Sequence, residues 1–206
     1  MGRDITKCHP ELQQKCAQLI EKCTQKGLNI AVGECYRTVE EQNELYAQGR
    51  TKTGNIVTNA KGSDYSSHHQ WGTAFDFYRN DGKGAYNDSD GFFGKVGSVG
   101  KSLGLEWGGD WTSPVDKPHF QLPYWGSTTA ELKRLYGTPE EFKKTWEAEE
   151  MEKIYNWTLE VPKWARPTVQ KLLDKGYLKG NDKGELELTY SMLKLLVVND
   201  RAGLYD

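Results

Sequence analysis

Two stretches of the sequence carry side chains that could bind a metal ion and do acid–base chemistry. In the first, His69 lies seven positions before Asp76, and in the second, Asp116 lies three positions before His119. Zinc takes imidazole nitrogens and carboxylate oxygens, and a catalytic zinc keeps three protein ligands and an open position for water. His69, Asp76 and His119 could be those three ligands. Asp116 could then be the base that takes a proton from the water and gives it to the leaving group.

The same residues have an ordinary structural interpretation, which the spacing alone leaves equally open. His69 and His119 could be loop histidines and Asp76 a turn carboxylate, because short motifs also match by chance. Two other histidines complete the four in the chain. We expect His68 to face solvent or to lie outside the ligand shell, since neighbours on an extended chain point to opposite sides. His9 is expected to stabilise the start of the first helix.

Three separated blocks of the chain resemble zinc D,D-peptidases of the VanY and VanX type, in the order found in that family. The central block matches the signature SxHxxGxAxD at Ser67, His69, Gly72, Ala74 and Asp76. The acidic residue three positions before His119 matches a later element of the family. Upstream, residues 36–51 resemble the branch that contains phage L-alanyl-D-glutamate peptidases, among them endolysins of Gram-positive phages. The resemblance runs from residue 9 to about residue 125.

The resemblance implies a role for each matching residue. His69, Asp76 and His119 would bind one zinc ion per chain. Asp116 would be the catalytic base, and the alanyl-glutamate branch also has an aspartate where other members have glutamate. Arg37 would steady the substrate and the oxyanion.

Further residues in and near these blocks are expected to support the site. Gln42 and Ser67 belong to the matching blocks, and we expect them to bind substrate. Asp110 is expected either to accept a hydrogen bond from the ring nitrogen of a ligand histidine that does not bind the metal or to be a turn residue. The three tryptophans between residues 107 and 125 are expected to form core or the wall of a cleft.

The resemblance also implies an activity. We expect a zinc-dependent endopeptidase that cleaves peptidoglycan stem peptides at the L-alanyl-D-glutamate bond and acts as a phage endolysin in host cell lysis. Two alternatives stay open. One is a D-Ala-D-Ala carboxypeptidase of the VanY type, which shares the zinc ligands, and the other is a non-catalytic cell-wall-binding protein. Loss of a ligand or of the base would favour the latter, and the sequence retains them all.

Hydrophobic periodicity and helix-capping residues predict the elements that must position these side chains. Helices are expected at 10–26, 38–46, 92–103 and from Thr138, and strands at 28–32, 74–78 and 119–122. Residues 50–66 are polar and should form a long loop. The predicted fold is α+β, a small antiparallel sheet flanked by helices as in zinc D,D-peptidases and hedgehog-like proteins, followed by a small helical module.

The composition changes at a glutamate-rich stretch near the C-terminal quarter of the chain. Residues 1–146 hold all the motifs and are expected to be the catalytic domain, and residues 147–160 are expected to be a linker or a helix extension. Residues 161–206 should form the helical module, with one helix over 164–175 and a second opening at Leu188. About 50 residues bury little core alone, so the module should bind the cell wall or pack on a second copy as a homodimer.

The overall composition excludes several classes of protein. Seven Trp, eleven Tyr and six Phe can supply a core, and the net charge of -2 leaves no basic excess for nucleic acid. No apolar run reaches the roughly 18 residues of a membrane anchor. The start of the chain lacks an apolar signal sequence, so we expect synthesis in the host cytoplasm and access to the wall through a holin-type lesion. The four cysteines lie within the first 35 residues and are expected to be buried thiols.

Overall fold

The computed structural model describes residues 2–205, and the side chains of all of these except 147–152. The chain divides into two compact units, Met1–Lys143 and Lys144–Asp206. Each unit has a hydrophobic core of its own. Among the described residues, no helix combines the length and the apolar character needed to cross a membrane.

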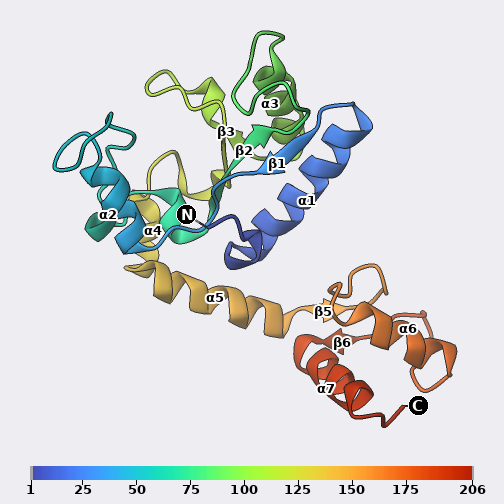
Figure 1. Ribbon diagram of the computed structural model, residues 1–206. Coiled ribbons are helices and arrows are strands. Elements are labelled where there is room, and N and C mark those ends of the chain that lie inside the picture. Colours follow the sequence, from blue (N-terminus) through green and yellow to red (C-terminus); the bar gives the residue numbers. More distant parts are fainter. Residues whose placement is uncertain (1, 206) are drawn as a thin grey trace. The chain divides into compact units, whose positions relative to one another are not determined.

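The first unit is built on a four-stranded sheet with the strand order β1-β2-β4-β3 (Figure 1). All of its pairings are antiparallel. The strands are β1 (Ile30–Val32), β2 (Ala74–Arg79), β3 (Glu106–Trp107) and β4 (His119–Gln121). The sheet and its flanking helices confirm the predicted α+β class. Strand β3 was not predicted, because two residues are too short to show an alternating pattern.

Two helices of this unit begin at the capping residues that the sequence predicts. Helix α1 (Pro10–Gln25) starts at His9, whose Nδ1 accepts a hydrogen bond from the amide of Glu11 at 3.3 Å, as expected. Helix α2 (Val39–Ala47) starts with the predicted capping box of Thr38 and Glu41. Helices α3 (Phe92–Ser102), α4 (Ala130–Tyr136) and α5 (Pro139–Glu152) follow. Helix α4 is short and was not predicted.

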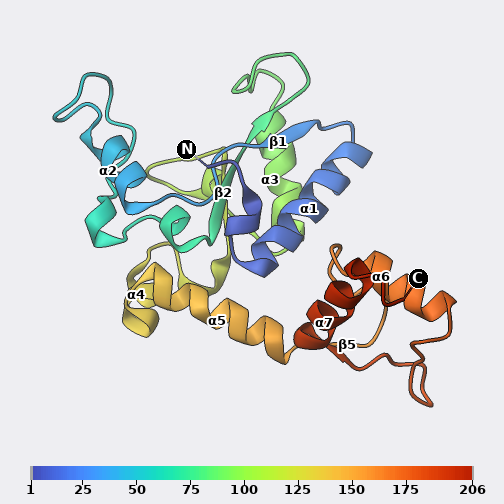
Figure 2. The same cartoon turned by 60° about the horizontal axis from the view of Figure 1, so that its bottom comes forward.

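The sheet separates an apolar side from a polar one. Helices α1 and α3 lie next to each other on one side of it, whereas α2 lies on the other (Figures 1 and 2). Because side chains alternate along a strand, Phe75, Phe77 and Phe120 enter the core beneath α1 and α3. The four cysteines belong to the buried residues of this region as free thiols, as expected. Alternate residues of the same strands then project toward the opposite face.

Two glycines let α3 approach the sheet closely. A methyl group at Gly97 would lie 2.4 Å from the ring of Trp107, and one at Gly100 would lie 2.2 Å from the ring of Phe120. Both distances are shorter than any real contact. The helix backbone therefore packs directly on the two aromatic rings.

The second unit contains the end of α5, which enters it at Lys144, followed by a two-stranded sheet and two further helices. Strands β5 (Ile154–Tyr155) and β6 (Leu188–Thr189) pair antiparallel, and helices α6 (Arg166–Asp174) and α7 (Tyr190–Arg201) complete the unit. The prediction that Leu188 opens a helix was wrong. Leu188 and Thr189 are extended, and the hydroxyl of Thr189 then caps α7 by accepting a hydrogen bond from the amide of Met192. In the stretch predicted as linker or helix extension, α5 continues to Glu152 and β5 follows.

The packing of α3 gives a testable prediction. Gly97→Ala and Gly100→Ala should each destabilise the protein by about 1–3 kcal/mol, because the added methyl group overpacks against an aromatic ring. Gly94→Ala is the matched control in the same helix, since its methyl group would meet nothing within 4 Å. It should stabilise by up to about 1 kcal/mol through helix propensity. Urea unfolding of the three variants measures the differences, and equal effects at all three positions would contradict this account of the packing.

Candidate metal and catalytic site

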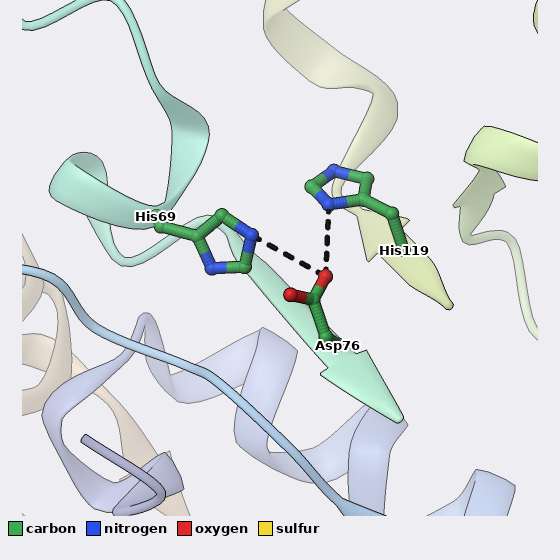
Figure 3. A group of neighbouring side chains, drawn as sticks. All are labelled: His69, Asp76 and His119. Atoms are coloured by element: carbon green, nitrogen blue, oxygen red, sulfur yellow. Dashed lines mark hydrogen bonds and ion pairs between the residues drawn. The ribbon is translucent and has the colours of Figure 1, made fainter. Parts of the chain in front are cut away.

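The pairing of β2 with β4 brings together the two stretches that carry the predicted metal ligands. Asp76 lies directly opposite His119 in this antiparallel pair, and His69 comes from the short 3-10 turn that precedes β2. Figure 3 shows both imidazoles pointing at the Asp76 carboxylate. Asp76 Oδ1 is 3.4 Å from His69 Nε2 and 3.2 Å from His119 Nδ1. One donor atom from each of the three residues lies within 4.8 Å of the others, which is the arrangement of a metal site.

A hydrogen bond on the far side of each ring orients the two imidazoles. His69 Nδ1 lies 2.7 Å from the carbonyl oxygen of Cys35. A carbonyl only accepts, so Nδ1 carries a proton, and Nε2 is the ring nitrogen that faces the cluster. His119 Nε2 lies 3.1 Å from Gln121 Oε1, which leaves Nδ1 toward Asp76. Both rings are about 95% buried (5% and 6% exposed), and this holds them in place.

The charges of the cluster are interdependent. Burial alone would raise the pKa of Asp76, but the nearby imidazoles and their hydrogen bonds hold that pKa well below its ordinary range. Burial alone would lower the pKa of His119, yet the hydrogen bond and charge of Asp76, with the charge of Asp116, raise it. The Asp76 carboxylate therefore stays ionised, and its negative charge favours a positive charge on the neighbouring His119.

Asp116 is fixed immediately beside the cluster by backbone hydrogen bonds. Its amide donates to the carbonyl of Gly108 at 2.9 Å, and its own carbonyl accepts from the amide of His119 at 3.2 Å. A side chain at position 108 would lie 2.5 Å from the Asp116 carbonyl oxygen, so only glycine allows this approach. Burial raises the pKa of the Asp116 carboxyl, and the charge of Asp76 adds to the effect.

Arg37 reaches the site along a segment that runs beside His69. The amide of Arg37 donates to the carbonyl of His69 at 3.2 Å. The guanidinium is buried and binds Glu34 through two nitrogens, with Nε 3.0 Å from Oε1 and Nη2 bonded to Oε2. Its Nη1 donates to Gln42 Oε1 at 2.5 Å. Glu34, the carboxylate that positions this arginine, lies outside the motifs found in the sequence.

Gln42 and Ser67, both expected to bind substrate, occupy different positions. Gln42 has no exposed surface. Besides binding Arg37, its Nε2 donates to the carbonyl of Ala60 at 2.7 Å and to the hydroxyl of Thr58 at 3.3 Å. In this structure Gln42 thus ties Arg37 to the loop after α2. Ser67 is partly exposed and directly precedes the turn that carries His69.

For two neighbouring residues the structure decides between the alternatives that the sequence left open. His68 does not face solvent: its side chain is buried, and its Nδ1 lies 2.9 Å from the hydroxyl of Thr73. Burial lowers the pKa of His68 to about 3. The reason is that residues 68–71 form a 3-10 turn rather than an extended strand. Asp110 is exposed and forms an ion pair with Lys101 at 2.7 Å, so it behaves as a turn residue.

Comparisons with known proteins agree on one family. A sequence profile described as D-alanyl-D-alanine carboxypeptidase, of the M15 peptidases, matches residues 61–122. The chain is 39% identical over 124 residues to the peptidoglycan L-alanyl-D-glutamate endopeptidase CwlK of Bacillus subtilis (strain 168), a match that covers 55% of this chain and 72% of that protein. It is 32% identical over 130 residues to the L-alanyl-D-glutamate peptidase of Listeria phage A118, covering 61% of this chain and 42% of that protein.

A solved structure is also similar. The L-Ala D-Glu endopeptidase ChiX of Serratia marcescens has a TM-score of 0.44 and 22% sequence identity, and the match covers 57% of this chain and 82% of that one.

Proposed function

The chain belongs to the M15 peptidase family that includes the peptidoglycan L-alanyl-D-glutamate endopeptidases, and from this premise we propose that it hydrolyses that bond in peptidoglycan stem peptides with a zinc ion held by His69, Asp76 and His119. The observation that carries the proposal is the convergence of three donor atoms within 4.8 Å inside the region that matches the family. The two named relatives favour the L-alanyl-D-glutamate bond.

The residues at the cluster fit zinc. Two imidazole nitrogens and one carboxylate oxygen are the donors that zinc prefers in a catalytic site with an open position. The opposite nitrogen of each ring is engaged by Cys35 and Gln121, as is typical of metal-binding histidines. A zinc ion held there would polarise the scissile carbonyl and acidify the attacking water.

The chain's own groups would move the proton and receive the developing charge. Asp116 is held beside the ligands and would take a proton from the attacking water and return it to the leaving amine. The contacts with Glu34 and Gln42 occupy three of the five N–H donors of Arg37. The two other donors would meet the oxyanion that forms on the scissile carbonyl. Ser67, at the edge of the site, would contact the peptide.

A second candidate activity is favoured by one observation. The profile that matches residues 61–122 is described as D-alanyl-D-alanine carboxypeptidase. That reaction would use the same ligands and base, so the two activities differ in the peptide that is bound and not in the chemistry of the site.

The products of digestion identify the bond. Purified peptidoglycan treated with the protein should yield stem peptides with a new N-terminal D-glutamate and wall strands that end in L-alanine, as read by mass spectrometry. Release of free D-alanine with intact alanyl-glutamate bonds would establish the carboxypeptidase instead. Asp110→Asn is the control variant, because its exposed carboxylate pairs with Lys101 away from the cluster, and it should give the wild-type products.

The roles of the two aspartates can be separated. Asp116→Asn should keep zinc but lose about 10²- to 10⁴-fold in turnover, because a neutral amide cannot accept the proton. Asp76→Asn should weaken zinc binding itself, since it removes a ligand charge. Zinc content after dialysis and the rate on a soluble stem peptide measure the two effects. If both variants lost zinc equally, the division between ligand and base would be wrong.

We further propose that the second unit binds the cell wall and that the protein acts there as a phage endolysin. Large apolar side chains are exposed on this unit, which is common at interaction surfaces; they include Trp157, Leu159, Trp164, Tyr177 and Leu195. The unit has its own core, with Tyr155, Val169 and Leu193 fully buried. It can therefore fold apart from the residues that carry the chemistry.

Removal of residues 153–206 tests this role. The shortened chain should cut a soluble stem peptide at the wild-type rate, because every proposed catalytic residue lies before the cut. It should sediment less with intact walls. Sedimentation velocity then separates the two explanations: a monomer in both forms supports a wall anchor, whereas a dimer that becomes a monomer supports a dimerisation unit and avidity. Unchanged wall binding would exclude both.

A further inference from the structure

A closed ring of contacts surrounds His119 on the side away from the proposed metal. In the pairing of β3 with β4, Glu106 lies directly opposite Gln121. Gln121 follows His119 by two positions on the same strand, so the two side chains share a face of the sheet. Gln121 Nε2 donates to Glu106 Oε2 at 3.2 Å. Glu106 Oε1 accepts from the indole nitrogen of Trp111 at 2.8 Å, and the Trp111 ring centroid lies 5.0 Å from that of His119.

These contacts determine which end of the Gln121 amide faces His119. The amide nitrogen has two neighbours, the Glu106 carboxylate and the carbonyl of Gly126, each at 3.2 Å. Both neighbours can only accept a hydrogen bond. The NH₂ group of Gln121 must therefore point toward them, and its oxygen must point at His119 Nε2, 3.1 Å away. Gln121 is fully buried, so water does not compete for these groups.

The amide orientation in turn determines the protonation of the ring. An amide oxygen accepts, so His119 Nε2 carries a proton, and Nδ1 is the ring nitrogen that faces Asp76 and can give a lone pair to a metal ion bound there. If the amide were turned around, its NH₂ group would require a lone pair on Nε2. The proton would then move to Nδ1, and Nδ1 could no longer bind a metal ion.

We propose that Glu106 is a positioning residue that acts through Gln121 to keep Nδ1 of His119 free for the metal ion. The inference rests on the proposed function, because it takes His119 to be a metal ligand. It assigns a role to a half-buried glutamate that touches neither the metal donors nor the proposed base. Trp111 completes the arrangement by holding the other carboxylate oxygen of Glu106.

Glu106→Gln should reverse the amide of Gln121. The indole N–H of Trp111 will hold the oxygen of the new amide, because it is a donor only. The NH₂ group of the new side chain then faces Gln121. The oxygen of Gln121 turns toward it, and the NH₂ of Gln121 turns toward His119 and gives up its hydrogen bond to the Gly126 carbonyl. We expect the zinc affinity to fall roughly 10- to 100-fold, the range found for groups that orient metal ligands. Chelator competition measures the affinity without reference to activity.

The exchanged pair should restore the affinity. In the double variant Glu106→Gln/Gln121→Glu, the carboxylate introduced at position 121 accepts from His119 Nε2 and from the new amide. It should recover part of the affinity lost in Glu106→Gln, because the Nε2 proton of His119 has its acceptor again, although the carboxylate cannot donate to the Gly126 carbonyl. The Nε2 proton of the zinc-loaded protein should be visible by NMR as a slowly exchanging imidazole signal in the wild type and the double variant, and weakened in Glu106→Gln. Asp110→Asn is the matched carboxylate-to-amide control and should leave both measurements unchanged.

The outcomes separate this inference from the metal site on which it rests. The role of Glu106 would be overturned if Glu106→Gln kept the wild-type zinc affinity, or if Glu106→Gln and the double variant lost the same amount. In both cases His69→Ala would still abolish zinc binding, so the metal site itself would stand. Full zinc content in both His69→Ala and His119→Ala would instead overturn the metal site, and the role of Glu106 with it. Thermal unfolding of the metal-free variants shows whether a loss of zinc affinity reflects misfolding. If Glu106→Gln is unstable, the zinc affinity of the double variant provides the test.

Discussion

The antiparallel register of β2 with β4 is the constraint on which the site depends. It sets Asp76 opposite His119 and, by alternation, sends Phe75 and Phe120 to the other face of the sheet. A slip of one residue would exchange the two faces, bury the polar groups in the core and expose the aromatic ones. The packing of Phe120 against the backbone of α3 therefore fixes the positions of the core residues and of the proposed metal ligands together. The same register, continued through β3, places Glu106 beside Gln121.

The two imidazoles are oriented by different kinds of partner. His69 is bound by the backbone carbonyl of Cys35, a contact that any residue at position 35 could make. His119 is bound by the side chain of Gln121, whose orientation depends in turn on Glu106 and on the carbonyl of Gly126. The first orientation is thus a property of the backbone path, whereas the second depends on residue identity. Substitutions can test the second directly, but not the first.

Sequence patterns predicted much of this architecture, and the failures have physical reasons. The capping box at Thr38, the stripe of α1 and the strand around Asp76 follow from local chemistry, so their positions could be predicted. Strand β3 and strands β5 and β6 have two residues each, too few for a period. The α+β class followed from the resemblance and from the alternation of predicted elements, and the sheet confirms it.

At the site itself, the sequence indicated the proposed ligands and the proposed base, but not the residues that orient them. The spacing of His69 and Asp76 alone left a structural role equally open, and the family resemblance singled out the groups that the fold brings within 4.8 Å. Glu34 is three positions before Arg37, a helical spacing in a segment that is not a helix, so no pattern marked it. Glu106 and Gln121 are 15 positions apart and meet only through strand pairing. The solvent-facing alternative for His68 failed because the chain there turns instead of extending.

The environments of the two aspartates differ in the direction that the proposed chemistry requires. Asp76 accepts hydrogen bonds from two imidazoles, which lower its pKa in spite of burial, so it remains a carboxylate. Asp116 has no such pair of donors among its described contacts, and burial together with the charge of Asp76 raises its pKa. Neighbouring acids whose pKa values are pushed apart divide the work of a site between them. A permanently charged Asp76 suits a metal ligand, and an Asp116 that protonates more readily suits a group that must accept a proton and then release it.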